Sequence, residues 1–219
     1  MKIFLDTSNK EHILKWLPLG IIDGVTTNPT TLSKEGKEPK KQILEICSAF
    51  PHGDISVEVT EQEPDKVYAQ AKAIAALAKN ITVKIPCQTR YYGVIKKLVE
   101  EKIAVNVTLV FTLIQALMMC KLGVRYISPF IGRWDDIDVQ GSEFLYEIRK
   151  MIDEYGFTTQ ILAASLRSPR HLHEAIAAGA DIATIAPEIL EKALNHLLTN
   201  QGVEKFLYDW SKLGNKQFP

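Results

Sequence analysis

The sequence predicts an α/β fold, a (β/α)8 TIM barrel, because short apolar strands alternate with amphipathic helices from end to end. Strands are expected at eight places, namely residues 3–6, 24–27, 55–59, 82–85, 104–108, 126–128, 160–164 and 181–185. Alternation of this kind implies parallel strands joined by right-handed crossovers. Eight repeats within 219 residues fit a compact barrel. A doubly wound open sheet is the alternative, but no glycine-rich fingerprint follows the first strand.

The predicted helices carry apolar residues at the spacing that buries one face. The segment 64–79 shows this pattern with Val67, Ala71 and Ile74. Further helices are expected at residues 10–17, 40–50, 92–101, 113–122, 141–155, 169–178 and 187–198.

The tail of the chain predicts one more helix. Residues 202–213 place Phe206, Leu207 and Trp210 on one face. We therefore expect a single barrel domain over residues 1–219, in which residues from about 201 to 219 form a C-terminal helical arm. This arm would fold onto the barrel or reach a neighbouring subunit.

The composition narrows the class of partner. The chain has 26 basic and 26 acidic residues, and this balance argues against a nucleic acid or a membrane surface held by bulk electrostatics. Three scattered cysteines, Cys47, Cys87 and Cys120, are typical of a reducing compartment. No signal-peptide core follows Met1, so we expect a cytoplasmic protein.

Lys84 lies inside a short β-branched run that ends at Pro86, and such a run predicts a buried strand. Burying an ammonium group is costly, so an inward lysine finds a partner or gives up its proton. A neutral lysine attacks carbonyl carbons and forms Schiff bases. Taken alone, Lys84 is better explained as a strand-end lysine whose ammonium group reaches solvent.

The strands around Lys84 favour the Schiff-base lysine over the lysine that reaches solvent. Barrel side chains alternate between the interior and the helix layer, so apolar residues on one phase place polar residues on the other. Val105, Val107 and Leu109 are assigned to the helix layer, which turns the residues between them inward. The same phase turns a set of polar residues toward the carboxyl ends of their strands: Asp6, Thr26, Asn28, Glu58, Lys84, Asn106, Thr108 and Ser128, with Ser165 at the mouth. Barrel active sites lie at that end, so a catalytic site is favoured over a polar core network.

These groups fit one kind of chemistry. Lys84 would attack a ketone, and Glu58 would carry protons through a water held by Thr108. Asp6 would take a hydroxyl proton as the adjacent carbon–carbon bond breaks. The imine is the electron sink, so we expect neither a cofactor nor a metal.

Two arginines predict an anionic substrate. Arg133 and Arg167 follow the sixth and seventh strands in loops at the catalytic end, where paired guanidinium groups suit a phosphate. His171 and His173 form a His-x-His pair without a third ligand, so a metal there is not expected. They are expected near a helix start, with one ring toward solvent.

Six segments resemble the small transaldolase family, which includes the fructose-6-phosphate aldolases, and they follow one another in the family's order along essentially the whole chain. They are Phe4-Leu5-Asp6-Thr7, Asp23-Gly24-Val25-Thr26-Thr27-Asn28-Pro29, Val83-Lys84-Ile85-Pro86, Asn106-Val107-Thr108-Leu109-Val110-Phe111, Ser128-Pro129-Phe130-Ile131-Gly132-Arg133 and Ala163-Ala164-Ser165-Leu166-Arg167.

The resemblance implies a barrel of the class I aldolase type, with Lys84 as the Schiff-base lysine and Asp6 as the acid/base of cleavage. It implies that Glu58 and Thr108 handle the catalytic water. It further implies contacts with phosphorylated sugar substrates from Thr26, Ser128 and Phe130, and contacts from Asn28 and Asn106 with substrate hydroxyls or with Lys84. Arg133, Ser165 and Arg167 are implied to be phosphate ligands. Members of the family are commonly ring-shaped, so the resemblance also implies a homo-oligomer, pentamer or decamer, with the C-terminal helix exchanged.

Two positions favour the transaldolase branch of the family. This chain resembles transaldolases in Glu58 and Phe130, where the aldolases typically have glutamine and tyrosine. The implied reaction moves a dihydroxyacetone unit between sedoheptulose 7-phosphate and glyceraldehyde 3-phosphate. A fructose-6-phosphate aldolase is the first alternative, and a non-catalytic sugar-phosphate-binding barrel is the remoter one.

Overall fold

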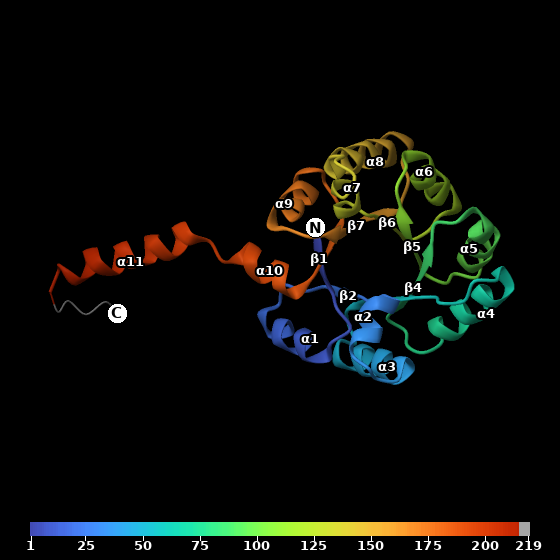
Figure 1. The fold of residues 1–219 in the computed structure, drawn as a ribbon, viewed down its shortest axis with the longest axis horizontal. Coiled ribbons are helices and arrows are strands. Elements are labelled where there is room, and N and C mark those ends of the chain that lie inside the picture. Colours follow the sequence, from blue (N-terminus) through green and yellow to red (C-terminus); the bar gives the residue numbers. More distant parts are fainter. Residues whose placement is uncertain (215–219) are drawn as a thin grey trace.

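The computed structural model describes residues 1–214 and shows a closed barrel in which each strand pairs with its sequence neighbour and β1 pairs with β8. All these pairings are parallel, and Figure 1 shows the helices arranged as an outer ring. The strands are β1 (Lys2–Asp6), β2 (Gly24–Thr26), β3 (Asp54–Glu58), β4 (Ile81–Pro86), β5 (Val105–Val110), β6 (Tyr126–Pro129), β7 (Gln160–Leu166) and β8 (Ile182–Ile185). The predicted (β/α)8 fold is confirmed.

The helices that follow β1 to β4 are α1 (Lys10–Trp16), the 3-10 turn η1 (Leu17–Leu19), α2 (Pro29–Lys34), α3 (Pro39–Ala49), α4 (Pro64–Ala75), the 3-10 turn η2 (Thr89–Tyr91) and α5 (Tyr92–Glu100). Those that follow β5 to β8 are α6 (Leu113–Leu122), α7 (Gly132–Asp135), α8 (Gly141–Tyr155), α9 (Pro169–Ala177), α10 (Pro187–Leu194) and α11 (Leu197–Ser211). Two short helices, α2 and α7, lie where the sequence predicted only loops. Both are too short to show an apolar period.

Polar residues directly after the strands begin several of these helices. Asn28 accepts the backbone N–H of Thr31 at 2.9 Å and caps α2, which continues from Pro29. Ser168 likewise accepts the N–H of His171 at 3.2 Å and caps α9. Side-chain oxygens at this position satisfy amide groups that the helix leaves unpaired. The caps therefore hold the loops at the carboxyl ends of the strands in place.

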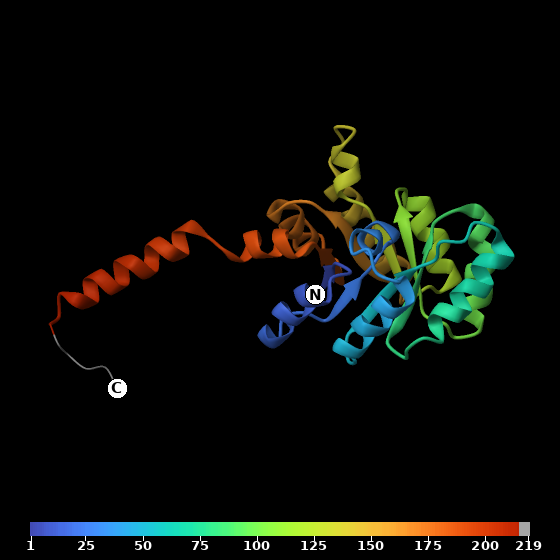
Figure 2. The ribbon, with the colours of Figure 1, turned by 60° about the horizontal axis from the view of Figure 1, so that its bottom comes forward.

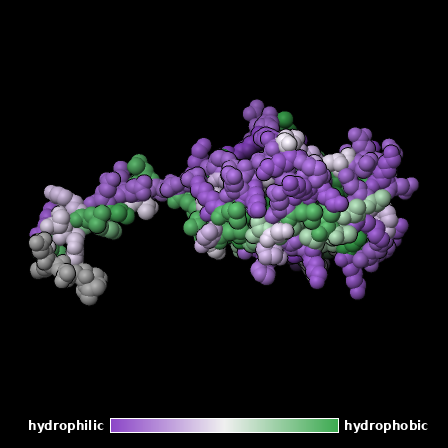
Figure 3. Space-filling model, turned by 90° about the horizontal axis from the view of Figure 1, so that it is seen from below, coloured by the Kyte–Doolittle hydropathy of each residue, from purple (hydrophilic) through white to green (hydrophobic). Residues whose placement is uncertain are grey.

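The chain departs from the barrel after α10. The predicted helix 187–198 is interrupted at Asn195, whose backbone is extended, and His196 caps the next helix through Leu198 N–H. Helix α11 then projects away from the barrel (Figures 1 and 2), and hydrophobic residues gather along part of its surface (Figure 3). None of its residues is buried. The predicted C-terminal helix is thus present, and residues 215–219 of the expected arm lie outside the described residues.

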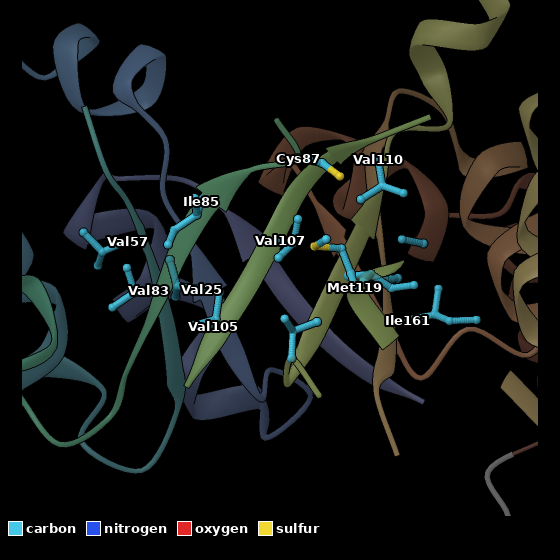
Figure 4. Packing of buried hydrophobic residues seen from close by; sticks show 14 of the residues in the cluster. Val25, Val57, Val83, Ile85, Cys87, Val105, Val107, Val110, Met119 and Ile161 are labelled. Atoms are coloured by element: carbon cyan, nitrogen blue, oxygen red, sulfur yellow. The ribbon is translucent and has the colours of Figure 1, made fainter. Parts of the chain in front are cut away.

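The main core fills the space between the strands and the helix ring. Val25, Val57, Val83, Ile85 and Val107 all point to this layer, as Figure 4 shows, and each is at most 1% exposed. They pack in one cluster with helix residues. This phase is the predicted one, and it leaves the alternate residues to the barrel interior.

A smaller apolar cluster fills the barrel interior. It consists of Phe4, Tyr126, Leu162, Ala164 and Ile182, with Phe130 packed against it. The Phe4 and Tyr126 rings meet edge to face with centroids 6.3 Å apart. Leu162, Ala164 and Phe130 of this cluster also line a cavity at the carboxyl ends of the strands, which is where barrel enzymes carry their sites.

The prediction that Leu109 faces the helix layer is wrong. The β5–β6 register shifts between Val107 and Val110, and Leu109 adopts a left-handed backbone with φ 58°. This bulge turns Leu109 to the cavity and gives its expected core place to Val110, which is fully buried. Strict alternation cannot anticipate an inserted residue.

Over residues 1–214, no helix combines the length and apolarity needed to cross a bilayer.

Candidate active site

A cavity of about 500 Å³ opens at the carboxyl ends of the strands. Every predicted site residue except Asn106 lines it: Asp6, Thr26, Asn28, Glu58, Lys84, Thr108, Ser128, Phe130, Arg133, Ser165 and Arg167. These residues come from strands and loops spread over most of the chain. Closure of the barrel therefore brings together side chains that are far apart in sequence.

Lys84 is only 6% exposed, and its ammonium group has two partners. Nζ lies 3.0 Å from Oε2 of Glu58 and donates to the backbone carbonyl of Thr27 at 3.2 Å. Glu58 and Lys84 are direct partners in the β3–β4 register, so the sheet itself sets this contact. The inward lysine has therefore found a carboxylate, and a proton can pass between the two groups.

Asp6 ends β1 on the same cavity wall. Its Oδ1 accepts hydrogen bonds from Thr26 Oγ1 at 3.3 Å and from Asn28 Nδ2 at 3.4 Å. Burial raises the pKa of Asp6 above its usual value, while the positive charge of Lys84 opposes that rise. A carboxyl group with a raised pKa is a stronger base when ionised, and it can hold a proton nearer neutral pH.

Thr108 presents an unused hydroxyl to the cavity. Its side chain is fully buried, and Oγ1 has no hydrogen-bond partner among the described residues. A buried hydroxyl without a partner is costly and calls for an explanation. A water or a substrate hydroxyl in the cavity would satisfy this oxygen.

Asn106 lies beneath the cavity wall, not on it. It is fully buried, accepts a hydrogen bond from Ser128 Oγ at 2.7 Å and donates to Ser56 Oγ at 3.2 Å. Ser128 therefore lies on the cavity wall, and Asn106 supports it from beneath through their hydrogen bond. Asn106 is thus absent from the cavity lining, and its contact with substrate or with Lys84 stays a prediction.

The side of the cavity where the sequence predicts phosphate contacts is formed by α7 and by the irregular part of β7 near Ser165. Arg133 lies over the Phe130 ring, with its guanidinium carbon 5.4 Å from the ring centroid. Ser165 has a left-handed backbone with φ 59°, where the β7–β8 register shifts. Both predicted arginines reach this side, because Arg167 also lines the cavity.

Some lining residues were not among the predicted site residues. Thr184 lines the cavity and lies 2.6 Å from Thr26, oxygen to oxygen. The sequence could have indicated Thr184, because it is the polar residue on the inward phase of the otherwise apolar strand β8. Leu109 could not have been found in this way, because only the bulge brings it inward.

Within residues 1–214, no group of three or more His, Cys, Asp or Glu side chains is arranged to hold a metal ion.

Solved structures with similar folds share little sequence with this chain. A designed cube-shaped, highly porous protein cage gives a TM-score of 0.62 at 14% identity, over 96% of this chain and 76% of that one. A structure described as native KDPGal gives 0.57 at 16% identity, over 84% and 81%. These likenesses show the barrel fold alone.

Sequence relatives are much closer. Probable transaldolases of Dehalococcoides mccartyi and Lactiplantibacillus plantarum are 42% and 46% identical over 97% and 96% of this chain, and over 99% and 96% of their own lengths. Probable transaldolase 2 of Listeria monocytogenes is 44% identical over 99% of both chains. The family model described as Transaldolase/Fructose-6-phosphate aldolase matches residues 3–217. The chain therefore belongs to the transaldolase/fructose-6-phosphate aldolase family.

Proposed function

We propose that this chain is a transaldolase that carries a dihydroxyacetone unit as a Schiff base on Lys84. One observation carries the proposal: the Lys84 ammonium lies in the cavity against the Glu58 carboxylate, at 3.0 Å, with Asp6 on the same wall. The relatives named probable transaldolase support the choice of reaction.

The first half of the reaction forms the imine. Glu58 takes a proton from Lys84, and the neutral amine adds to the ketone carbon of the donor sugar. The resulting carbinolamine loses its hydroxyl as water when Glu58 returns a proton to it. Thr108 holds that water through its unpartnered Oγ1. The imine nitrogen then withdraws electrons from the neighbouring carbon–carbon bond.

The second half breaks and remakes that bond. Asp6 accepts the proton of the hydroxyl next to the bond, so an aldose leaves and an enamine remains on Lys84. Thr26 and Asn28 keep the Asp6 carboxylate aimed at this hydroxyl through their hydrogen bonds. Addition of a second aldose runs the same steps in reverse, and hydrolysis of the imine frees Lys84.

The phosphate of the sugars is assigned to Arg133, Ser165 and Arg167. Two guanidinium groups at one side of a cavity suit a dianion. In this assignment the implied donor and acceptor pairs are sedoheptulose 7-phosphate with glyceraldehyde 3-phosphate, and fructose 6-phosphate with erythrose 4-phosphate. The reaction would then belong to the pentose phosphate pathway.

Phe130 favours transfer over simple cleavage. Its ring lines the cavity and packs against Phe111, with centroids 6.0 Å apart. A phenyl ring has no proton to donate, so the enamine waits for an acceptor aldose. A fructose-6-phosphate aldolase stays the second candidate, because the family description names both activities.

One assay separates the candidates. Glyceraldehyde 3-phosphate release from fructose 6-phosphate is measured with and without erythrose 4-phosphate. Release only with the acceptor supports transaldolase, and equal release without it makes the chain an aldolase. Absence of release, together with no borohydride-stable adduct on Lys84, would make the chain a non-catalytic sugar-phosphate-binding barrel.

The assembly is part of the proposal. We propose one barrel domain whose C-terminal arm docks on a neighbouring subunit in a homo-oligomer, pentamer or decamer. Phe206 and Leu207 on α11 are 74% and 64% exposed, which leaves apolar area that an assembly would cover. Multi-angle light scattering of the full chain and of a chain ending at Asn195 tests this proposal, since loss of the oligomer is expected only in the shorter chain.

The three cysteines support a reducing compartment. Cys47, Cys87 and Cys120 are all free and buried. We therefore propose that the enzyme works in the cytoplasm, and cell fractionation with an antibody against the chain checks this assignment.

A further inference from the structure

The segment that contains α7 projects beyond the carboxyl end of the barrel, as Figure 2 shows in yellow. The segment comprises residues 132–140, and it carries Arg133 and Asp136, which follows α7 directly. The segment lies against the loop after β7, where Arg167 lines the cavity. Two separate contacts tie it to that loop, and neither of them was predicted from the sequence.

The first contact joins two charged side chains. The two terminal nitrogens of Arg167 donate to the two carboxylate oxygens of Asp136, with Nη2 2.9 Å from Oδ2. The guanidinium holds the pKa of Asp136 below its usual value, and Asp136 in turn raises the pKa of Arg167. This end-on, two-point geometry fixes the plane of the guanidinium group.

The arginine stem is held as closely as its head. A Cβ at Gly132 would stand 3.0 Å from Cγ and Cδ of Arg167 and 2.3 Å from the Ser165 carbonyl oxygen. Only glycine therefore allows α7 to begin in contact with the Arg167 stem. The start of α7 and the Arg167 side chain are fitted to each other.

The second contact involves His171, whose imidazole is 4% exposed. Nδ1 accepts the backbone N–H of Arg167 at 3.1 Å, and Nε2 lies 2.6 Å from Oδ2 of Asp135. Because Nδ1 accepts, the arrangement assigns the ring proton to Nε2, which donates to the carboxylate. His171 thus links the Arg167 backbone to α7, while His173 is exposed as predicted.

Stability alone does not account for the Asp136 contact. Arg167 and Asp136 have side chains 48% and 54% exposed, and ion pairs this exposed contribute little to folding. The contact uses the end of the guanidinium group, and the structure records no hydrogen bond from Nε of Arg167 to any described residue. The Nε edge of the Arg167 guanidinium group is therefore available to bind a ligand in the cavity.

We propose that Asp136, with the His171–Asp135 pair, positions Arg167 so that its Nε edge binds the phosphate of the sugar substrate. Asp136 fixes the guanidinium plane, and His171 fixes the backbone from which the side chain extends. A pre-oriented guanidinium loses less side-chain entropy when it binds its ligand. The inference rests on the proposed function only in its choice of a sugar phosphate, because the prearranged anion site is argued from the contacts themselves.

The test measures affinity for inorganic phosphate by titration calorimetry on the full chain. Asp136→Asn keeps the shape of the side chain but removes its charge, and it is expected to weaken phosphate binding about fivefold, the scale of one lost contact. Arg167→Ala shows how far phosphate affinity falls when the whole Arg167 side chain is lost. Asp136→Glu keeps the negative charge and should therefore bind phosphate more tightly than Asp136→Asn. Asp138→Asn is the matched control, because Asp138 lies in the same segment and asparagine tolerates its left-handed backbone.

Kinetics add a readout that a purely structural role would not move. Asp136→Asn should raise KM for fructose 6-phosphate while kcat and the kinetics with unphosphorylated fructose stay as in the unmodified chain. His171→Leu should act in the same direction, because leucine has neither the acceptor for Arg167 N–H nor the donor to Asp135. Tighter phosphate binding in Asp136→Asn, an equal effect in Asp138→Asn, or no phosphate binding by the unmodified chain would overturn the inference. If the chain binds phosphate as expected but shows no transfer, the proposed function fails and the inference stands.

Discussion

Lys84 and Glu58 are direct register partners on adjacent strands, and their charged atoms lie 3.0 Å apart inside the barrel. Both side chains are largely buried, at 7% and 13% exposed. In such a pair each charge depends on the other, because an isolated buried charge is costly. Removal of either charge is therefore expected to affect both the stability of the cavity wall and proton transfer between Lys84 and Glu58.

Lys84→Arg is expected to abolish covalent trapping. Arginine keeps a positive charge beside Glu58 but forms no Schiff base with a ketone. Treatment with fructose 6-phosphate and borohydride, followed by mass spectrometry of peptides, should show an adduct on Lys84 of the unmodified chain and none in the variant. Lys79→Arg is the control, since Lys79 is exposed in the connection between α4 and β4 and does not line the cavity. An adduct that persists in Lys84→Arg would contradict the assignment.

Glu58→Gln is expected to slow imine formation and hydrolysis, because the amide carries no proton between Lys84 and water. The loss in kcat should be roughly a hundredfold or more, the range of a missing general acid/base. The rate of borohydride-trapped adduct formation measures the step directly. Glu61→Gln changes an exposed glutamate in the loop after β3 and should leave that rate unchanged. An unaltered rate in Glu58→Gln would assign proton transfer to another group.

Phe130→Tyr is expected to convert transfer partly into cleavage. A phenol at this place can protonate the enamine, so glyceraldehyde 3-phosphate release without acceptor should rise roughly tenfold, a modest contribution for a positioned proton donor. Phe111→Tyr is the matched control, since Phe111 packs on Phe130 but does not line the cavity. If acceptor-free release stays at its original level, Phe130 is not the reason for transfer.

Asp6→Asn is expected to stabilise the protein at neutral and alkaline pH while it removes activity. The raised pKa of Asp6 means that the folded state binds this proton more tightly than the unfolded chain does. Asp6 therefore favours folding most below its unfolded pKa, and this contribution is lost as pH rises through the folded pKa. The melting temperature of Asp6→Asn should exceed that of the unmodified chain at pH 8, and the difference should shrink toward pH 4. A lower melting temperature at pH 8 would refute the argument.

Leu109 provides a test of backbone strain. Leu109→Gly should change stability by less than about 1 kcal/mol, because relief of the left-handed backbone offsets the lost burial. Leu109→Val should destabilise by at least about 1 kcal/mol, because a β-branched residue fits a positive φ poorly. Urea denaturation of the pair measures both values. Equal stability of the two variants would show that the bulge is not strained.

The sequence already contained most of the barrel and most of its site. Alternation is a local property, so the phase of Val83 and Ile85 indicates that Lys84 faces inward without knowledge of its neighbours. The same argument could have found Thr184 on β8. It could not find the bulge at Leu109, because an inserted residue leaves no mark in an apolar strand. Nor could it separate Asn106, which supports the wall, from Ser128, which forms it, because both lie on the inward phase.

By itself, the sequence determined the order of strands and helices, the inward phase of Lys84 and the chemistry that the polar residues around it would allow. Those properties follow from periodicity and residue type, which act over a few residues. Only the tertiary structure decided which groups meet: Glu58 with Lys84, Asp136 with Arg167, and His171 with Asp135. Such pairs are set by barrel register and by loops folded onto each other, and these long-range constraints are not written in any single segment.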